Sequence, residues 1–240
     1  MILILRSALF NVAFFTTTAI FLIAGLPVLA AGRTGVFKLA RAWSQTSLWL
    51  LEKICGARVE FRGVERIPRG PVLLAAKHQS ALETFALLHH FPDFSFILKR
   101  ELLRLPLFGW YLRRAEQIAI DRTSGRAALG QVVERAKALF AEGRSVFIFP
   151  EGTRRAVGAP PSYKMGVAHI YDATGATCLP VALNTGVCWP RRSFLKRPGL
   201  VVIEYLDPIP PGLSKKEFAS RLQDVIETRS NQLAAPPRVD

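Results

Sequence analysis

His78 and Glu83 are the two residues whose types and spacing best fit acid–base chemistry. His78 directly follows an apolar strand pattern at residues 72–76, where a substrate can reach it, and neutral imidazole is the natural base near pH 7. Such a base needs an acceptor that holds its second ring nitrogen. Residues five apart in one helix diverge by about 140°. Glu83 can therefore serve only if His78 precedes the helix and Glu83 lies in its first turn.

The same segment also has a purely structural interpretation. Ser80 and Glu83 form a capping-box pattern, in which each side chain bonds the backbone of the other residue at a helix start. Capping would explain these two residues but would leave His78 without a role. Spacing alone leaves both interpretations open.

A second loop with unusual chemistry follows the apolar run at residues 145–149 and reads Pro-Glu-Gly-Thr-Arg-Arg. Gly152 lets backbone N–H groups approach a ligand, Thr153 offers a hydroxyl, and Arg154 offers a planar fork suited to phosphate. Glu151 is expected either to organise the arginine side chains or to be a solvated acid. A Gly-containing turn with two arginines is also common on surfaces, so this loop alone is a weak signal.

Short β-rich runs that alternate with helical patterns must position these loops. This alternation predicts an α/β fold with a mixed, largely parallel sheet of about seven strands flanked by helices. Ligands of such sheets collect at the carboxyl ends of the strands, where both loops lie. The expected strands are 58–62, 72–76, 94–98, 117–120, 145–149, 177–183 and 200–206, and the expected helices are near 80–90, 124–141, 164–174 and 214–233.

The amino-terminal segment carries no charge between Ser7 and Gly32, which exceeds the ~20 residues that cross ~30 Å of hydrocarbon. A cleaved signal peptide, a single spanning helix and a helix that enters the membrane and turns near Pro27 all fit. We favour the last, followed by an amphipathic helix at about 34–54. That second helix is expected either to lie at the membrane interface or to pack on the core as an ordinary helix. The predicted organisation is a membrane-associated helical hairpin at 1–56 and a catalytic domain at 57–240.

Composition narrows the classes of partner. Half of the 240 residues are apolar, and 32 Lys and Arg against 18 Asp and Glu give a net charge of +14. This excess favours nucleic acid or an anionic membrane, but no nucleic-acid-binding signature accompanies it. The three cysteines lack regular spacing, which indicates buried thiols in a reducing compartment and neither a disulfide framework nor a metal cluster.

Four blocks in order resemble the PlsC-type glycerolipid acyltransferases, the 1-acylglycerol-3-phosphate (lysophosphatidic acid) acyltransferases, over residues 58–230. The family's His-x4-Asp block is similar to His78-Gln-Ser-Ala-Leu-Glu83, and its Phe-Pro-Glu-Gly-Thr-Arg block is complete at 149–154. Residues 99–109 with 120–122 resemble its second block, and 179–182 its fourth. Glu83 stands where the family usually has Asp, so the carboxylate is kept on a side chain one methylene longer.

The resemblance implies the glycerolipid acyltransferase fold and acyl transfer from a thioester, acyl-ACP or acyl-CoA, to a lysophospholipid hydroxyl. His78 would act as the base and Glu83 as its orienting acceptor, with no metal and no cofactor beyond the thioester co-substrate. The residues expected to bind substrate are Lys99, Arg122, Glu151, Gly152, Thr153 and Arg154.

The expected setting is the cytoplasmic face of the inner membrane, with anionic lipid and no nucleic acid as partner. Residues 102–114 mix large apolar side chains with arginines and are expected either to contact the membrane or to form a buried crossover. Transfer to another lysolipid, such as a lyso-ornithine lipid or lysophosphatidylcholine, and a non-catalytic lipid-binding role remain alternatives.

Overall fold

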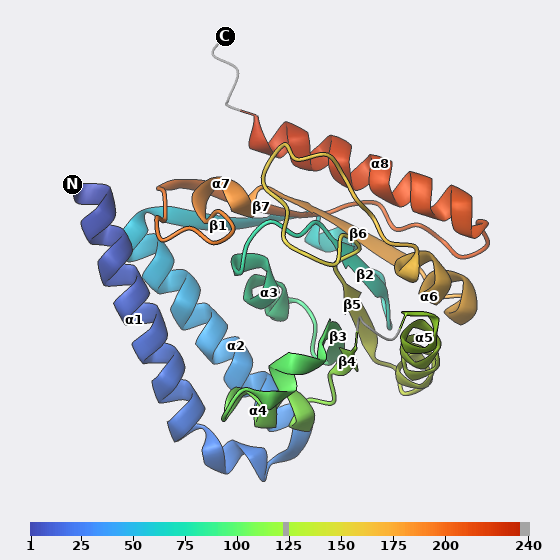
Figure 1. Ribbon diagram of the computed structural model, residues 1–240, viewed down its shortest axis with the longest axis horizontal. Coiled ribbons are helices and arrows are strands. Elements are labelled where there is room, and N and C mark those ends of the chain that lie inside the picture. The colour runs from blue at the N-terminus through green and yellow to red at the C-terminus, as the bar shows by residue number, and fades with distance from the viewer. Residues whose placement is uncertain (122–124, 236–240) are drawn as a thin grey trace.

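The computed structural model describes residues 1–121 and 125–235, which contain one seven-stranded sheet in the order β1-β7-β6-β2-β5-β3-β4 (Figure 1). Neighbouring strands are parallel except for β6 and β7, which are antiparallel. The predicted mixed, largely parallel sheet is therefore confirmed. The strands are β1 Ala57–Arg62, β2 Leu73–Ala76, β3 Phe94–Lys99, β4 Ile118–Ile120, β5 Ser145–Ile148, β6 Cys178–Leu183 and β7 Gly199–Tyr205.

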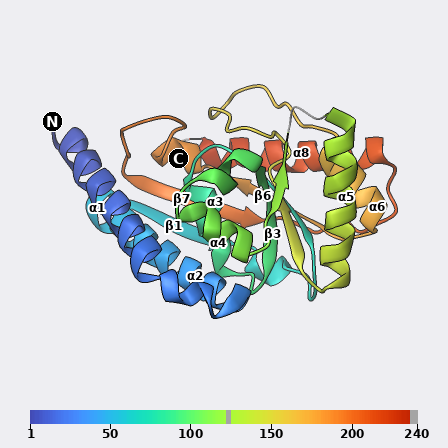
Figure 2. The ribbon, with the colours of Figure 1, turned by 60° about the horizontal axis from the view of Figure 1, so that its bottom comes forward.

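Helices cover both faces of the sheet because its central strands are apolar on both sides (Figures 1 and 2). In β2, Leu73 and Ala75 join one core cluster while Leu74 and Ala76 join the other, and all four are fully buried. The helices α5 Gly125–Ala141, α6 Gly166–Thr174 and α8 Lys215–Ala234 cover one face. The other face is covered by α1 Ile2–Ala24, α2 Gly32–Leu50, α3 Leu82–Ala86 and α4 Phe108–Arg114, while α7 Thr185–Cys188 follows β6.

The helices differ from the sequence expectation mainly in length. The helix expected near 80–90 is the short α3, continued by a 3-10 turn at Leu87–His89. The helix expected at 34–54 ends its regular part at Leu50 and closes with a π-helical turn at Leu51–Cys55. Gly56 stops this turn with φ 71°, a left-handed conformation that glycine adopts without steric cost. Helices α4 and α7 were not expected, because four to seven residues are too few to show a helical period.

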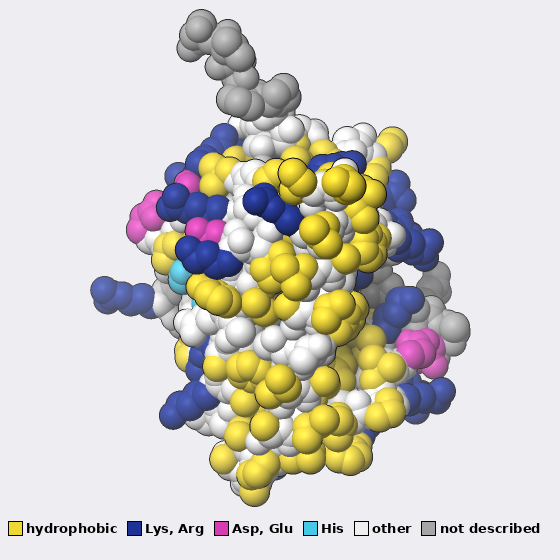
Figure 3. Space-filling model, turned by 90° about the vertical axis from the view of Figure 1, so that its left-hand side faces the viewer, with side chains coloured by type: hydrophobic (Ala, Val, Ile, Leu, Met, Phe, Trp, Pro, Cys, Tyr) yellow, Lys and Arg dark blue, Asp and Glu magenta, His cyan; other side chains and the backbone are white. Residues whose placement is uncertain are grey.

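The two amino-terminal helices form a hairpin in which α1 and α2 lie side by side (Figure 2). Helix α1 is long and apolar enough to cross a membrane, and only 11% of its most apolar 18 residues are buried. Figure 3 views this side of the molecule, where apolar side chains form a broad area with Lys and Arg mostly at its margins. The exposed apolar side chains of α1 are Ile2, Ile4, Leu5, Leu9, Val12, Phe15, Ile20 and Ile23.

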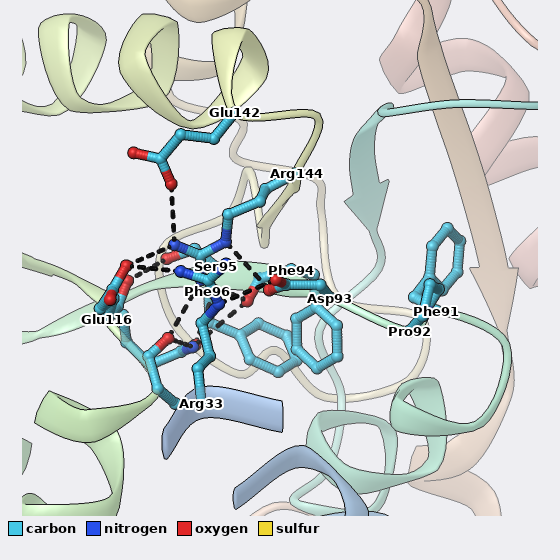
Figure 4. Close-up of polar contacts among 12 residues, drawn as sticks. Arg33, Phe91, Pro92, Asp93, Phe94, Ser95, Phe96, Glu116, Glu142 and Arg144 are labelled. Atoms are coloured by element: carbon cyan, nitrogen blue, oxygen red, sulfur yellow. Dashed lines mark hydrogen bonds and ion pairs between the residues drawn. The ribbon is translucent and has the colours of Figure 1, made fainter. Parts of the chain in front are cut away.

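A buried arginine joins the hairpin to the amino-terminal edge of the sheet (Figure 4). Arg144 precedes β5 and lies 2.9 Å from Asp93 and 2.8 Å from Glu116, the residues that lead into β3 and β4. Arg33 of α2 contacts the same two carboxylates at 2.8 and 2.9 Å. The hairpin is thus fixed at the edge opposite to the His78 loop. The three cysteines are free and buried, as expected.

Candidate active site

The site is assembled at the carboxyl ends of four adjacent strands. β6, β2, β5 and β3 are consecutive in the sheet, and all four run parallel to one another. His78 follows β2, Phe149 follows β5, Thr185 follows β6, and Lys99 is the last residue of β3. The parallel register therefore brings together loops that lie far apart in the sequence.

Glu83 is the centre of the first loop. Its Oε1 accepts hydrogen bonds from His78 Nδ1 at 2.8 Å, from the Gln79 N–H at 2.8 Å and from the Ser80 N–H at 2.7 Å. Its Oε2 accepts from the Thr185 hydroxyl at 2.7 Å, and the side chain is fully buried. His78 precedes α3 and Glu83 is the second residue of that helix, which is the arrangement that the sequence argument required.

Only one of the two hydrogen bonds of the predicted capping box is present. Glu83 accepts from the Ser80 backbone, but the Ser80 hydroxyl accepts from the Leu82 N–H at 3.1 Å and α3 has no side-chain cap. Capping and orientation of the histidine are therefore not alternatives here. One carboxylate does both, because each of its oxygens can accept more than one hydrogen bond.

The His78 imidazole is held flat against Phe149, with ring centroids 4.0 Å apart and an interplanar angle of 16°. Because Nδ1 is engaged by Glu83, Nε2 is the nitrogen left for a substrate. The side chain is 13% exposed and lines a cavity. Stacking and the Nδ1 bond together leave the ring little rotational freedom, which is what a positioned general base requires.

The cavity has a volume of about 630 Å³, within the usual range of ligand pockets, and its walls are mostly apolar. It follows β3 from Lys99 to Phe94, a length of about 17 Å at about 3.3 Å per residue. Side chains of α1 and α2 form part of its wall. The segment 102–114, expected either to contact the membrane or to be buried, is partly buried and partly exposed. Leu102, Phe108, Tyr111 and Leu112 line the cavity, whereas Leu105 and Trp110 are exposed.

Cationic residues line the same cavity as His78. Lys99 and Arg154 were expected there from the sequence, and Gly152 and Thr153 line it as well. Arg191 and Arg192 were not expected. The Arg191 guanidinium donates to the Arg154 carbonyl at 2.7 Å, which joins the loop after α7 to the Phe-Pro-Glu-Gly-Thr-Arg block at 149–154. Arg122, also expected to bind substrate, lies outside the described residues.

Glu151 lies elsewhere than expected. It is neither solvated nor paired with the neighbouring arginines: it is 2% exposed and is absent from the cavity wall. Its Oε1 accepts from Lys77 Nζ at 2.9 Å and its Oε2 from the His78 N–H at 3.1 Å. Burial raises the pKa of the Glu151 carboxyl, and the Lys77 ammonium opposes that shift. The residue therefore supports the backbone of the His78 loop and does not line the cavity.

Sequence reasoning missed Thr185 and Gln79. Thr185 follows the apolar run of β6 just as His78 follows that of β2, so the signal was present but was not applied to a third strand. The Gln79 Oε1 accepts from the Gly186 N–H at 3.1 Å and joins the same two loops. Among the residues that the structure describes, no group of three or more His, Cys, Asp or Glu side chains could hold a metal ion.

A histidine with a carboxylate on Nδ1 and a free Nε2 can take a proton from a hydroxyl group. The stacked dyad at an apolar cavity with cations in its wall thus suits attack by an alcohol that carries both an anionic group and an apolar chain.

Comparison with known proteins agrees with this geometry. The acyltransferase family model matches residues 58–184. A 1-acyl-sn-glycerol-3-phosphate acyltransferase of Pseudomonas aeruginosa is 40% identical over 161 residues, which are 67% of this chain and 63% of that protein. The chain thus spans about three fifths of that relative's length. A protein of the same name from Borreliella burgdorferi is 30% identical over 76% of this chain and 72% of its own.

The fold has a solved counterpart over nearly all of its length. The crystal structure of the 1-acyl-sn-glycerophosphate (LPA) acyltransferase PlsC from Thermotoga maritima superposes with a TM-score of 0.81. It is 25% identical, and the match covers 98% of each chain. The match of the family model to more than half of the sequence, together with these relatives, leads to one conclusion: the chain belongs to the acyltransferase family.

Proposed function

We propose that this chain transfers a fatty acyl group from acyl-ACP or acyl-CoA to the sn-2 hydroxyl of 1-acylglycerol-3-phosphate, giving phosphatidic acid for phospholipid biosynthesis. The observation that carries this proposal is the His78–Glu83 dyad at an apolar cavity of about 630 Å³ that is also lined by Lys99 and Arg154. The names of the relatives support the choice of acceptor.

In the proposed reaction His78 Nε2 takes the proton of the acceptor hydroxyl as its oxygen attacks the thioester carbonyl carbon. Glu83 stabilises the imidazolium that forms. The tetrahedral intermediate then collapses, the carbon–sulfur bond breaks, and the imidazolium returns its proton to the leaving thiolate. The acyl group passes directly from sulfur to oxygen, so the thioester is a co-substrate and no further cofactor is proposed.

The acceptor's phosphate is proposed to bind Arg154 and Lys99, with Arg191 and Arg192 as further cations in the same wall. Arginine suits a phosphate because its fork donates two parallel hydrogen bonds. Arg122 is proposed for this role on the family resemblance alone.

The proposed location is the cytoplasmic face of the inner membrane, with α1 inserted through its exposed apolar side. The net charge of +14 favours a leaflet rich in anionic lipid. Both substrates carry long acyl chains that partition into a bilayer, so a cavity walled partly by α1 and α2 suits their entry.

The test is an acyl-transfer assay with acyl-ACP and acyl-CoA against a panel of lysolipids, comparing the unaltered protein with His78→Ala. We expect phosphatidic acid from lysophosphatidic acid, and loss of product in the variant. Equal product from both proteins would refute the mechanism. Faster transfer to lyso-ornithine lipid or lysophosphatidylcholine would reassign the acceptor.

A further inference from the structure

Lys77, the residue before the catalytic histidine, is buried between two carboxylates. Its Nζ donates to Glu151 Oε1 at 2.9 Å and to Glu227 Oε1 at 2.6 Å. The side chains of Lys77, Glu151 and Glu227 are 4%, 0% and 14% exposed. An ion cluster this far from water persists only where its geometry satisfies every charge, so we expect the three side chains to be held rigidly.

The cluster is hydrogen-bonded to the main chain of His78. Glu151 Oε2 accepts the His78 N–H at 3.1 Å, and the His78 carbonyl accepts the Arg155 N–H at 2.8 Å. The loop that contains Glu151 thus holds the histidine backbone through both of its polar groups. Lys77 joins Glu151 to Glu227, so the position of the Glu151 side chain depends in part on where Lys77 is held.

Glu227 lies on α8, outside the residues that the family model matches. Figure 1 shows α8 running along the face of the sheet next to β6. Ser230, one turn after Glu227, accepts the Leu183 N–H at 3.2 Å at the end of β6. Asn184 donates to the Leu233 carbonyl at 2.9 Å, and the next residue is Thr185, which bonds Glu83. One face of α8 is therefore connected to His78 through Lys77 and Glu151, and to Glu83 through Asn184 and Thr185.

The charge balance of the cluster makes Glu227 more than a packing residue. One ammonium serves two carboxylates, and the buried hydroxyl of Tyr163 lies near enough that both raise its pKa, after burial itself. Removal of Glu227 leaves the ammonium with Glu151 as its one carboxylate partner, and the Lys77 side chain can then change its position. Glu151 would then move, and the His78 backbone with it.

We propose that Glu227 is a positioning residue of the catalytic dyad, which acts through Lys77 and Glu151 to hold the backbone of His78. The inference rests on the proposed acyl transfer only for its kinetic readout. Helix α8 is in this view part of the active site, although none of its residues lines the cavity.

The test compares Glu227→Ala with Asp172→Ala. Asp172 forms the matched control because its carboxylate also binds a lysine, Lys215, at 3.0 Å and also ties α8 to the body of the protein. That pair is nearly half exposed and does not touch the His78 loop. In Glu227→Ala we expect kcat to fall at least tenfold and up to about 100-fold, with KM unchanged for both substrates. In Asp172→Ala kcat should be unchanged. Glu227→Gln keeps an acceptor oxygen for Lys77 and should recover most of the activity.

Histidine ring NMR gives a readout that does not depend on turnover. The chain has four histidines, and His78→Gln assigns the signal of His78. We expect this signal to shift in Glu227→Ala and to stay in place in Asp172→Ala. If the two variants show the same kcat and the same His78 signal at equal folded fraction, the inference is wrong. If the unaltered protein transfers no acyl group, the proposed function fails, and the NMR comparison still decides the positioning role. If Glu227→Ala does not fold, Glu227→Gln against Asp172→Asn makes the same comparison.

Discussion

Glu83→Gln separates the electrostatic role of the carboxylate from its structural role. The glutamine oxygen can still accept at the Oε1 position from His78 and the two backbone N–H groups. Its NH2 group would replace Oε2 opposite Thr185, whose hydroxyl can turn to accept. The helix start should therefore survive. Glu83→Ala is a poorer test, because it would remove the acceptor of all four donors, at about 1–3 kcal/mol for each donor left buried and unsatisfied.

The expected loss of activity follows from charge alone. When His78 takes the substrate proton, a cation forms beside the carboxylate, with the charge centres about 4 Å apart. At an effective dielectric constant near 20 this attraction is worth about 4 kcal/mol. Its removal should lower kcat by about 10³-fold, at about 1.36 kcal/mol per decade. The thermal midpoint of unfolding should change little by comparison.

The assay is steady-state acyl transfer, together with thermal unfolding of each variant by circular dichroism. The double variant His78→Ala/Glu83→Gln should be no slower than His78→Ala, because the carboxylate acts only through the imidazole. The reasoning is refuted if Glu83→Gln folds and keeps kcat within about threefold of the unaltered enzyme, because that change raises the activation free energy by less than about 0.7 kcal/mol. Additive losses in the double variant would show that Glu83 also acts without His78.

Four further outcomes are expected. Thr185→Val removes the donor to Glu83 Oε2, and urea unfolding should show a loss of about 1.5–3 kcal/mol together with a lower kcat. Arg154→Ala should raise KM for lysophosphatidic acid far more than for monoacylglycerol, and equal losses on both acceptors would count against phosphate binding. Arg144→Met should lower the free energy of unfolding by about 2–3 kcal/mol without changing KM. This is less than the about 3–5 kcal/mol typical of a fully buried pair, because its carboxylate partners are partly exposed. Burial lowers the pKa of His89 and His90 below the ordinary 6.5, so the unfolded chain binds more protons than the folded one. The contribution of these histidines to stability should therefore be complete above pH 6.5 and decline as the pH falls below it. The difference between urea midpoints at pH 7 and pH 5 should be smaller in His89→Gln/His90→Gln than in the unaltered protein.

The sheet was predictable because its strands are buried on both faces and carry continuous apolar runs such as Val-Phe-Ile at residues 146–148. His78 and Glu83 were predictable because they lie five residues apart, so that a single loop and helix start bring them together. The division of the chain into a membrane-associated hairpin at 1–56 and a catalytic domain at 57–240, in contrast, stays a prediction.

The supports of the dyad were not predictable, because each comes from a distant strand or helix. Thr185 bonds Glu83 across 102 residues and Glu227 bonds Lys77 across 150. No local pattern encodes such a contact, which exists only once the strand order is known. Glu151 illustrates the same limit. Arginines follow it three and four residues later in the sequence, but its partner in space is a lysine in the loop after the adjacent strand.

The pairing of Ala57 in β1 with Gly199 in β7 has a consequence for biosynthesis. β1 must wait for β7 to leave the ribosome, and Glu227 emerges later still. Helix α1, by contrast, ends at Ala24 and is synthesised long before either of them. At 5–20 residues per second the interval from Ala24 to Glu227 is about 10–40 s. For that time the nascent chain displays an apolar helix without the rest of the fold. A ribosome-bound chain stalled before α8 should therefore bind lipid vesicles and yet be catalytically silent.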